Sequence, residues 1–358
     1  MSGGAGRIVM HVDLDAFFAS VEEREEPSLK GRPLVIGADP RGGAGRGIVA
    51  TANYPARRFG VRSAMPISTA WRLCPRAEFR RPRFDLYAAA SRRVMELLRP
   101  EADVFEPAGI DEAYLDVSSR GSFEAARDVA KALRERVRAG ERLTVSAGIG
   151  PNKLVAKIAS DHRKPDGLTV VIPSRVAEFL GPKDASVLFG VGPKTRERLG
   201  ALACETVADV AALPEERLVR EFGSFGRFLA REARGSDDRP VDPAWEQKQV
   251  GREVTFERDT GDWEEVLRTL DGCVEEVAGQ LAADGHWART LAVKIRYDGY
   301  ETHSRQTTLK LPTGRREHMA AGARALVGPF RRPGRRVRLV GFSASGLVPP
   351  EDLLPLFP

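Results

Sequence analysis

The spacing of apolar residues in the N-terminal part of the chain predicts four strands and two long helices. Strands are expected where apolar residues run together or alternate, at residues 8–12, 102–107, 112–117 and 143–149. Helices are expected where apolar residues recur every three or four positions, at residues 84–98 and 123–139. The apolar stripes of these helices are Leu86, Ala90, Val94 and Leu97 in the first, and Phe123, Ala126, Ala130, Leu133 and Val137 in the second. Ser122 is the expected N-cap of the second helix, and Gly140 follows its expected end.

The order strand, helix, strand, strand, helix, strand is that of a ferredoxin-like fold, provided that residues 17–82 are an insertion after the first strand. In this fold the third strand lies beside the first and runs antiparallel to it. The end of the first strand therefore meets the start of the third. This places Asp13 next to Asp111 and Glu112, although they are far apart in the sequence.

The inserted segment contains two short apolar runs, at residues 34–36 and 48–50, separated by a glycine-rich loop at residues 42–47. The loop lacks the lysine pattern of a phosphate-binding loop, so it is expected to be a hairpin turn. A helix is expected to start at Asn53, with Pro55 as its first residue.

Three carboxylates are the strongest candidates for metal-binding residues. Asp13 ends the apolar run of the first strand, and Asp111 and Glu112 are adjacent at the start of the third. Carboxylates at the mouth of a buried strand are costly unless a cation is present, so the pattern predicts a divalent metal site. The alternative, that Asp111 and Glu112 are turn residues, is left open by that stretch alone.

Two later stretches have residue types that bind phosphate. Lys153 and Lys157 share a face of the next expected helix, whose N-terminus would attract a phosphate, although solvated lysines are the alternative. Gly190, Gly192 and Lys194 lie in a glycine hairpin that opens another helix. Glycines there would let backbone amides approach a phosphate closely.

The C-terminal region is expected to be separate and strongly polarised in charge. Residues 235–249 are polar and contain prolines, as in a linker. Beyond them we expect a strand at 252–256, a helix at 263–283 and a strand at 291–297. Residues 241–288 carry 4 basic and 12 acidic side chains, and residues 289–338 carry 13 basic and 3 acidic ones. This imbalance predicts a surface that binds a phosphate backbone, against the alternative of a solvated charged face.

Composition narrows the class of protein further. The 358 residues suffice for more than one domain, and the net charge of +6 favours a polyanionic partner. The three cysteines, Cys74, Cys204 and Cys273, have the spacing of neither a disulfide framework nor a metal site. The sequence shows no signal-peptide core and no apolar run long enough to cross a membrane, so we expect a cytoplasmic protein that is not membrane-bound.

Four motifs follow one another along the chain: Val12 to Glu22, Ala50 to Arg57, Ile110 to Asp116 and Ala156 to Asp161. Together they resemble the motifs of the Y-family of translesion DNA polymerases, and most closely those of the bacterial DNA polymerase IV (DinB-type) branch. The resemblance covers nearly the whole chain. It implies an error-prone, template-directed DNA polymerase that acts in DNA repair by synthesis past damaged bases, without a proofreading nuclease. The alternatives are a palm-fold nucleotidyl cyclase and a non-catalytic DNA-binding relative.

The resemblance implies an α+β multidomain fold with a ferredoxin-like palm, a fingers insertion, a helical thumb and a C-terminal α/β little-finger domain. The expected bounds are 1–16 and 83–172 for the palm, 17–82 for the fingers, 173–236 for the thumb, 237–248 for a linker, 249–346 for the little finger and 347–358 for a C-terminal tail.

Motif matching also implies roles for individual residues. Asp13, Asp111 and Glu112 are the expected catalytic residues and, with the backbone carbonyl of Leu14, the ligands of two Mg²⁺ ions, whereas Asp15 is not an expected ligand. The residues expected to contact the incoming deoxynucleoside triphosphate are Phe18, which lies under the sugar, Thr51, Tyr54, Arg57 and Lys157. Those expected to contact the primer–template DNA are Gly190, Gly192 and Lys194.

The chain departs from the family pattern in three places. Gly109 stands where the family usually has serine, and Pro55 replaces a more usual acidic residue. The C-terminal peptide resembles the sliding-clamp-binding peptide of bacterial polymerases, but Leu353 stands where glutamine is expected. The residues expected to bind the clamp are Leu354, Leu356 and Phe357. The chain is expected to be a monomer.

Overall fold

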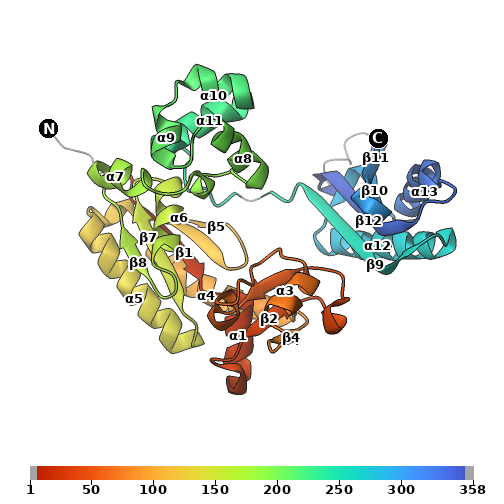
Figure 1. Ribbon diagram of the computed structural model, residues 1–358, viewed down its shortest axis with the longest axis horizontal. Helices are drawn as coiled ribbons and strands as arrows, with labels where there is room; N and C mark the ends of the chain where they lie inside the picture. Colours follow the sequence, from red (N-terminus) through yellow and green to blue (C-terminus); the bar gives the residue numbers. More distant parts are fainter. Residues whose placement is uncertain (1–5, 245, 351–358) are drawn as a thin grey trace. The chain divides into compact units, whose positions relative to one another are not determined.

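The computed structural model describes residues 6–244 and 246–350 of the chain. The chain forms two compact units that divide after Ala244, with the short segment 44–47 assigned to the second unit (Figure 1). The predicted linker, residues 237–248, spans this division. Each unit is described by itself.

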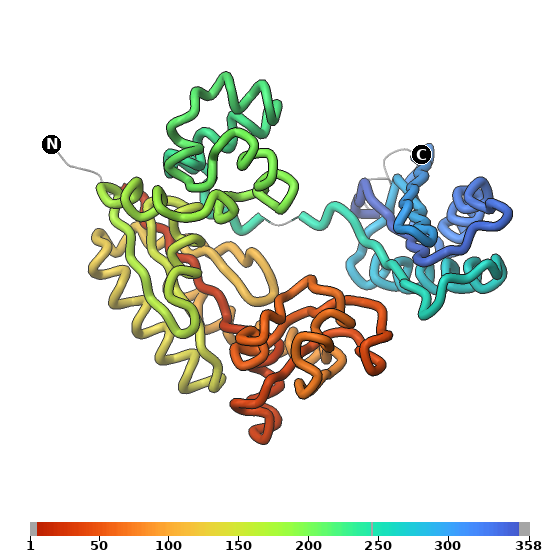
Figure 2. The backbone as a smooth tube through the Cα atoms, in the orientation of Figure 1, coloured from red at the N-terminus to blue at the C-terminus, as the bar shows by residue number. Residues whose placement is uncertain are grey.

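A five-stranded sheet forms the centre of the first unit. Its strands are β1 (Val9–Leu14), β5 (Val104–Pro107), β6 (Glu112–Asp116), β7 (Val145–Gly150) and β8 (Leu168–Val170). They lie in the order β5-β6-β1-β7-β8, and β1 runs antiparallel to both β6 and β7. The predicted antiparallel pairing of the first and third ferredoxin strands is therefore confirmed. Figure 2 shows the red N-terminal strand beside the yellow-green chain of β7.

Residues of β1 alternate between two layers of helices. Met10, Val12 and Leu14 face the core that is shared with α4 (Phe84–Leu98) and α5 (Phe123–Glu141). The alternate residues, His11 among them, face α6 (Lys153–His162) on the other side of the sheet. Glycine at position 148 permits this close packing, because a Cβ there would lie 2.1 Å from the carbonyl oxygen of Ala156.

The bounds of α4 match the prediction, and its predicted stripe faces the core only in part. Ala90 and Val94 are fully buried, whereas Leu86 and Leu97 are partly buried and pack against the core. The buried residues are Tyr87, Ala90, Ser91, Val94 and Leu98. The prediction was based on the spacing of aliphatic residues and so did not include Tyr87. The hydroxyl of Tyr87 can be buried because it donates a hydrogen bond of 2.6 Å to Glu22.

The predicted end of α5 at Ala139 is two residues too early. The helix continues to Glu141 and ends at Arg142, which adopts the left-handed conformation with φ of 53°. The two additional residues place the Glu141 carboxylate 2.7 Å from the guanidinium of Arg24 and 2.6 Å from that of Arg93. These ion pairs stabilise the last turn of the helix beyond the glycine. Ser122 caps the other end as predicted, by accepting the backbone N–H of Ala125.

The inserted segment forms its own three-stranded sheet, in the order β3-β2-β4. Its elements are α1 (Phe17–Glu25), β2 (Leu34–Gly37), β3 (Val49–Ala52), α2 (Tyr54–Arg57), α3 (Ile67–Leu73) and β4 (Glu78–Arg80). The glycine-rich loop joins the antiparallel strands β2 and β3, as predicted. Asn53 caps α2 by accepting the backbone N–H of Ala56, so Tyr54 is the first helical residue and Pro55 the second, not the first as expected.

Five short helices follow the sheet and pack on α6. They are α7 (Val176–Leu180), α8 (Pro193–Ala201), α9 (Val207–Ala212), α10 (Glu215–Phe222) and α11 (Ser224–Ala233). Their common core includes Leu154, Val155 and Ile158 of α6. Helix α6 therefore separates the sheet from this helical region.

The second unit is a four-stranded antiparallel sheet with two helices. The strands are β9 (Gln249–Thr260), β10 (Trp287–Tyr297), β11 (Thr302–Thr313) and β12 (Val337–Val348), in the order β11-β10-β12-β9. Helices α12 (Trp263–Ala283) and α13 (Arg316–Val327) share one core with the sheet. Within the described parts of both units, no helix has the length and apolar character needed to span a membrane.

Candidate active site

The pairing of β1 with β6 brings the three predicted carboxylates to one end of the sheet. Asp13 lies directly opposite Glu112 in the antiparallel register. The backbone N–H of Leu14 donates a hydrogen bond of 2.9 Å to the carbonyl of Asp111. The predicted adjacency of these residues is therefore confirmed, and the alternative that Asp111 and Glu112 belong to an isolated turn does not hold for Glu112, which begins β6.

Two lysines that flank this site balance its charge. The ammonium group of Lys164 lies 2.7 Å from a carboxylate oxygen of Asp13 and 2.7 Å from one of Asp161. Lys157 of α6 bonds to the carboxylate of Glu112. Sequence reasoning selected Lys157 but missed Lys164, which follows the end of α6 and carried no motif of its own.

Glu112 also contacts a buried histidine that sequence reasoning missed. His11 is fully buried, and its Nε2 lies 3.2 Å from a carboxylate oxygen of Glu112. Its Nδ1 lies 2.8 Å from the hydroxyl of Ser160, which donates its single proton to the carbonyl of Lys157. The imidazole ring therefore lies between the Ser160 hydroxyl and the Glu112 carboxylate, and these two neighbours fix its orientation. The period-two spacing of His11 and Asp13 in β1 was the signal that could have identified it.

The protonation behaviour of the three carboxylates differs because their surroundings differ. Burial raises the pKa of Asp13 to about 6, although Lys164 opposes this shift. Burial and the neighbouring Glu112 raise the pKa of Asp111. The pKa of Glu112 is lowered to about 2, first by His11 and then, against burial, by Lys157. Two of the three carboxylates thus lie where additional positive charge would stabilise their ionised forms.

The residues of this site suit a divalent cation. Within residues 6–244 and 246–350, the side chains as they stand form no cluster of three or more His, Cys, Asp or Glu groups arranged to hold a metal ion. The donor set nevertheless consists of carboxylate and carbonyl oxygens, which are the ligands that Mg²⁺ prefers. A cation close to Asp13 and Asp111 lowers their raised pKa values, and in this structure the neighbouring positive charges are those of lysines.

The inserted subdomain contributes a tyrosine and an arginine near this end of the sheet. The Tyr54 hydroxyl lies 3.5 Å from a carboxylate oxygen of Asp15, and burial followed by Asp15 raises the pKa of Tyr54 to about 12. The guanidinium of Arg57 lies 4.9 Å from the centroid of the Tyr54 ring and donates a hydrogen bond of 2.8 Å to the carbonyl of Ala52. Thr51 is half-buried on β3. Tyr54 thus remains a neutral hydrogen-bond donor at physiological pH.

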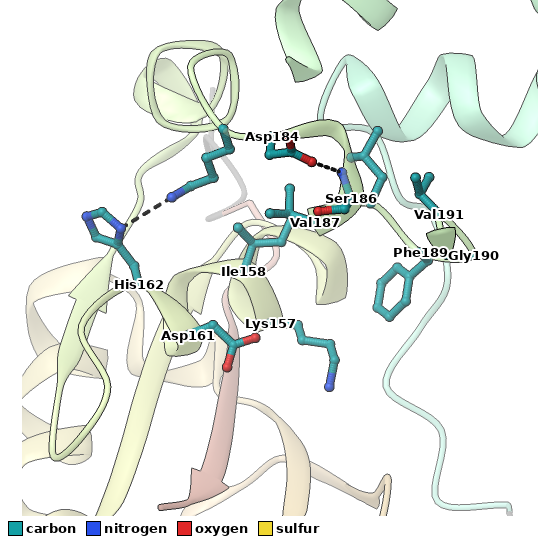
Figure 3. Close-up of a pocket in the computed structure, with 13 residues that line it drawn as sticks. Lys157, Ile158, Asp161, His162, Asp184, Ser186, Val187, Phe189, Gly190 and Val191 are labelled. Atoms are coloured by element: carbon teal, nitrogen blue, oxygen red, sulfur yellow. Dashed lines mark hydrogen bonds between the residues drawn. The ribbon is translucent and has the colours of Figure 1, made fainter. Parts of the chain in front are cut away.

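A pocket of about 840 Å³ lies between α6 and the glycine hairpin. Figure 3 shows Lys157, Ile158 and Asp161 of α6 on one side of this pocket and the segment from Ser186 to Val191 on the other. Gly190 has a φ of 77°, and a Cβ there would lie 2.8 Å from the ring of Phe225. Both the backbone conformation and the space therefore require glycine at this position.

Comparisons with known proteins agree with these features. Family models described as the impB/mucB/samB family and its C-terminal domain match residues 12–161 and 247–353. The DNA polymerase IV of Methanoculleus marisnigri is 46% identical over 341 residues, which cover 95% of this chain and 94% of that protein. The DNA polymerase IV of Alkalilimnicola ehrlichii is 42% identical, with 96% of each chain covered. A solved chimeric Y-family DNA polymerase of Dbh and Dpo4 has a TM-score of 0.85 at 32% identity, covering 96% of this chain and 99% of that one.

The chain belongs to the Y-family of DNA polymerases. It is a translesion, DNA-directed DNA polymerase, and membership of the family implies dependence on a divalent metal. The expected α+β architecture is that of its Y-family structural neighbours and is confirmed. The cyclase and non-catalytic alternatives are not favoured.

Asp15 has a structural role in this Y-family site. It lies just beyond β1, is almost fully buried, and accepts hydrogen bonds from the hydroxyl of Ser146 at 2.7 Å and the backbone N–H of Asp166 at 2.8 Å. The carboxylate of Asp15 therefore joins β7 to the loop before β8.

The two adjacent phenylalanines that begin α1 have different surroundings. Phe17 is 2% exposed and belongs to the main core. Phe18 is only partly buried, and its ring stacks on that of Tyr87 with centroids 4.4 Å apart and planes 12° apart. The more accessible ring is the one that the resemblance places under the sugar.

The predicted phosphate site at the start of α6 needs correction. Lys153 is buried and makes two hydrogen bonds of 2.6 and 2.7 Å to the carboxylate of Glu106. The backbone N–H of Leu154 donates to a carboxylate oxygen of Asp237 at 3.1 Å. Both the helix N-terminus and Lys153 therefore have internal anionic partners and are neither a phosphate site nor solvated.

The basic stretch of the second unit is partly neutralised. Lys294 pairs with Glu253 on the sheet face that lacks helices, and Arg324 pairs with Asp271 at 2.5 Å. Within the described part of the chain, several basic residues of this stretch have no acidic partner within ion-pair distance: Arg289, Arg305, Lys310, Arg315, Arg331 and Arg336. The predicted clamp-binding residues Leu354, Leu356 and Phe357 lie outside the described residues.

Proposed function

We propose that Asp13, Asp111 and Glu112 are the catalytic carboxylates with which this chain transfers a deoxynucleotide from its triphosphate to the 3′ hydroxyl of a DNA primer. The observation that carries the proposal is the register of β1 and β6, which sets Asp13 opposite Glu112. These carboxylates and the carbonyl of Leu14 would hold two Mg²⁺ ions. When bound, the ions supply the positive charge that favours an ionised primer hydroxyl and offsets the charge on the leaving phosphates.

The surrounding side chains bind the other parts of the nucleotide. Tyr54, Arg57 and Lys157 bind the triphosphate, with the Thr51 hydroxyl as a weaker contact. The arrangement of Arg57 over the Tyr54 ring supports this role, because it presents a cation and a neutral donor together. Phe18 lies against the sugar and excludes a 2′ hydroxyl.

The primer–template binds to two surfaces. The hairpin residues Gly190 and Gly192 offer backbone N–H groups to phosphates, and Lys194 adds a positive charge. The basic residues of the second unit that have no acidic partner among the described residues add sequence-independent attraction to the DNA backbone. These proposed contacts are with the DNA backbone and not with the template bases, so they are the same opposite damaged and intact bases. We propose residues 1–16 and 83–172 as the palm, 17–82 as the fingers, 173–236 as the thumb and 249–346 as the little finger.

Primer extension by matched variants tests the catalytic assignment. Asp111→Asn should reduce extension at least about a hundredfold, equal to ~2.7 kcal/mol, and should leave DNA binding unchanged, because the basic surfaces remain. Asp116→Asn is the control, since Asp116 lies at the opposite end of β6 and accepts the backbone N–H of Ser118, which an amide oxygen also does. Extension by Asp111→Asn at the parental rate would contradict the assignment. A cyclic nucleotide product would support a cyclase instead.

We further propose that the chain acts as a cytoplasmic monomer that binds a sliding clamp through Leu354, Leu356 and Phe357. Deleting residues 352–358 should lower clamp-stimulated synthesis and preserve synthesis without the clamp. Equal stimulation of the truncated and full chains would exclude this peptide as the attachment point.

A further inference from the structure

The chain after α11 does not leave the first unit at once but runs back over the sheet and α6. We call residues 235–242 the clasp. The side-chain amide of Asn152 donates to the carbonyl of Gly235 at 2.8 Å, and the backbone N–H of Asp242 donates to the carboxylate of Glu106 at 2.8 Å. Between them, Val241 is 6% exposed and packs with residues of β1, β6 and α6. A segment with the composition of a linker is therefore attached to the palm at both ends.

An arginine of the clasp also holds the base of the glycine hairpin. Arg239 donates to both carboxylate oxygens of Asp237, at 2.7 and 2.9 Å. Asp237 is itself anchored, because its carboxylate accepts the backbone N–H of Leu154 in the first turn of α6. The guanidinium of Arg239 lies 4.6 Å from the ring centroid of Phe189 and 5.7 Å from that of Phe228.

Phe189 is therefore fixed through both its ring and its backbone. Its N–H donates a hydrogen bond of 2.9 Å to Glu232, a carboxylate that is 1% exposed and lies 3.5 Å from the guanidinium of Arg239. Gly190, which requires its left-handed conformation, follows immediately. Any change in the position of Phe189 is thus transmitted to the first glycine of the hairpin.

We propose that Arg239 is a positioning residue for the hairpin of residues 189–192, and that the clasp links this hairpin to α6, the helix that carries Lys157. The effect on DNA binding rests on the proposed function of the hairpin. Asp237 fixes the guanidinium plane, and the plane in turn fixes the Phe189 ring. Lysine would keep the ion pair with Asp237 but would lack the planar surface.

The chain contains a matched control for this arginine. Arg198 lies 4.6 Å from the ring centroid of Phe222 and pairs with Glu221 at 2.8 Å, yet among the described residues no hydrogen bond, ion pair or ring contact joins it to the hairpin or to α6. Arg198→Ala therefore removes the same kinds of interaction from the same helical region. If Arg239→Ala and Arg198→Ala differ in their effect on the hairpin, the cause is the location of Arg239 beside the hairpin. The loss of a cation–π pair is common to both variants and cannot explain the difference.

Amide hydrogen exchange in the free protein tests the inference without DNA. Arg239→Ala should increase exchange at residues 189–192 at least about tenfold, Arg239→Lys should give an intermediate increase, and Arg198→Ala should match the parent there. Phe189→Leu removes the ring but keeps the pair of Arg239 with Asp237, and combining it with Arg239→Ala should add little further exchange. Parental exchange in Arg239→Ala, or full additivity in the double variant, would overturn the inference. If Arg239→Ala fails to fold, the Arg239→Lys and Phe189→Leu variants decide.

Binding and kinetics then separate this inference from the function of the hairpin. Arg239→Ala should weaken primer–template binding about tenfold, equal to ~1.4 kcal/mol, with little change in the KM for the nucleotide. Increased exchange with unchanged DNA affinity would uphold the positioning role and refute DNA binding by the hairpin. Unchanged exchange with weakened DNA affinity would refute the positioning role, since Arg239 would then act as a direct contact.

Discussion

The buried carboxylate of Glu232 should make the stability of this polymerase fall as the pH rises toward neutrality. Burial raises its pKa from 4.5 to about 7, although the N–H of Phe189 and the nearby Arg239 oppose the shift and Asp237 adds to it. Since the folded state holds the proton more tightly than the unfolded state, unfolding between about pH 4.5 and 7 releases it. The stabilisation is complete below about pH 4.5 and is lost as the pH rises through 7.

The size of this effect follows from the shift. At about 1.4 kcal/mol for each pKa unit, a shift from 4.5 to about 7 corresponds to on the order of 3 kcal/mol between the two pH limits. Because the Glu232 side chain is 1% exposed, solvent screening reduces this value little. A contribution of this size is a large fraction of the stability of a typical domain.

Glu232→Gln isolates the contribution of this group. The amide oxygen still accepts the N–H of Phe189, but the side chain no longer titrates. Urea unfolding of parent and variant between pH 5 and 8, followed through the helical signal, should show a free-energy difference that changes by about 2–3 kcal/mol in favour of the variant as the pH rises. A constant difference across this range would refute the argument, as would a change of opposite sign.

Three further outcomes follow from the site. Phe18→Ala should fold, continue DNA synthesis and gain ribonucleotide insertion by about tenfold or more, since a ring that excludes a hydroxyl is worth ~1–3 kcal/mol; parental sugar discrimination in single-nucleotide insertion would exclude the role. In the metal-free protein, the carboxyl of Asp13 should titrate near pH 6 in ¹³C NMR, and Lys164→Met should raise its pKa, because Lys164 opposes the effect of burial; a lower pKa would contradict this. Glu253→Gln should release Lys294 and tighten DNA binding, with the slope of log K against log salt steeper by about 0.9; an unchanged slope would show that Lys294 does not reach a phosphate.

The arrangement of the strands that carry Asp13 and Glu112 could be predicted because it follows from the order of strands and helices. The apolar run of β1 and this order place Asp13 beside Glu112 without any knowledge of side-chain contacts. The charge partners could not be found in this way. Lys164 reaches Asp13 only because of the path that the chain takes after α6, and a lysine beyond a helix end has no pattern that distinguishes it from a solvated one.

The clasp shows why amino-acid composition alone cannot distinguish a linker from a loop that is ordered by tertiary contacts. Polar residues and prolines indicate a loop, and residues 236–244 indeed contain no helix or strand. Their order comes instead from tertiary contacts, such as that of Asp237 with the N-terminus of α6. A carboxylate that caps a helix far away in the sequence leaves no local signal, because the preference that it satisfies belongs to the helix.

These contacts meet on α6, which explains why a short helix determines so much of the site. Its first turn receives Asp237, Lys157 reaches Glu112, and Ser160 orients His11 behind the same carboxylate. Its opposite face shares a core with helices α7 to α11. Gly148 allows the backbone of this helix to lie directly on the sheet, so a side chain there would displace the helix and every one of these contacts together. Helix α6 therefore contacts Glu112, His11 and the clasp at once, so a shift of this helix changes these contacts together.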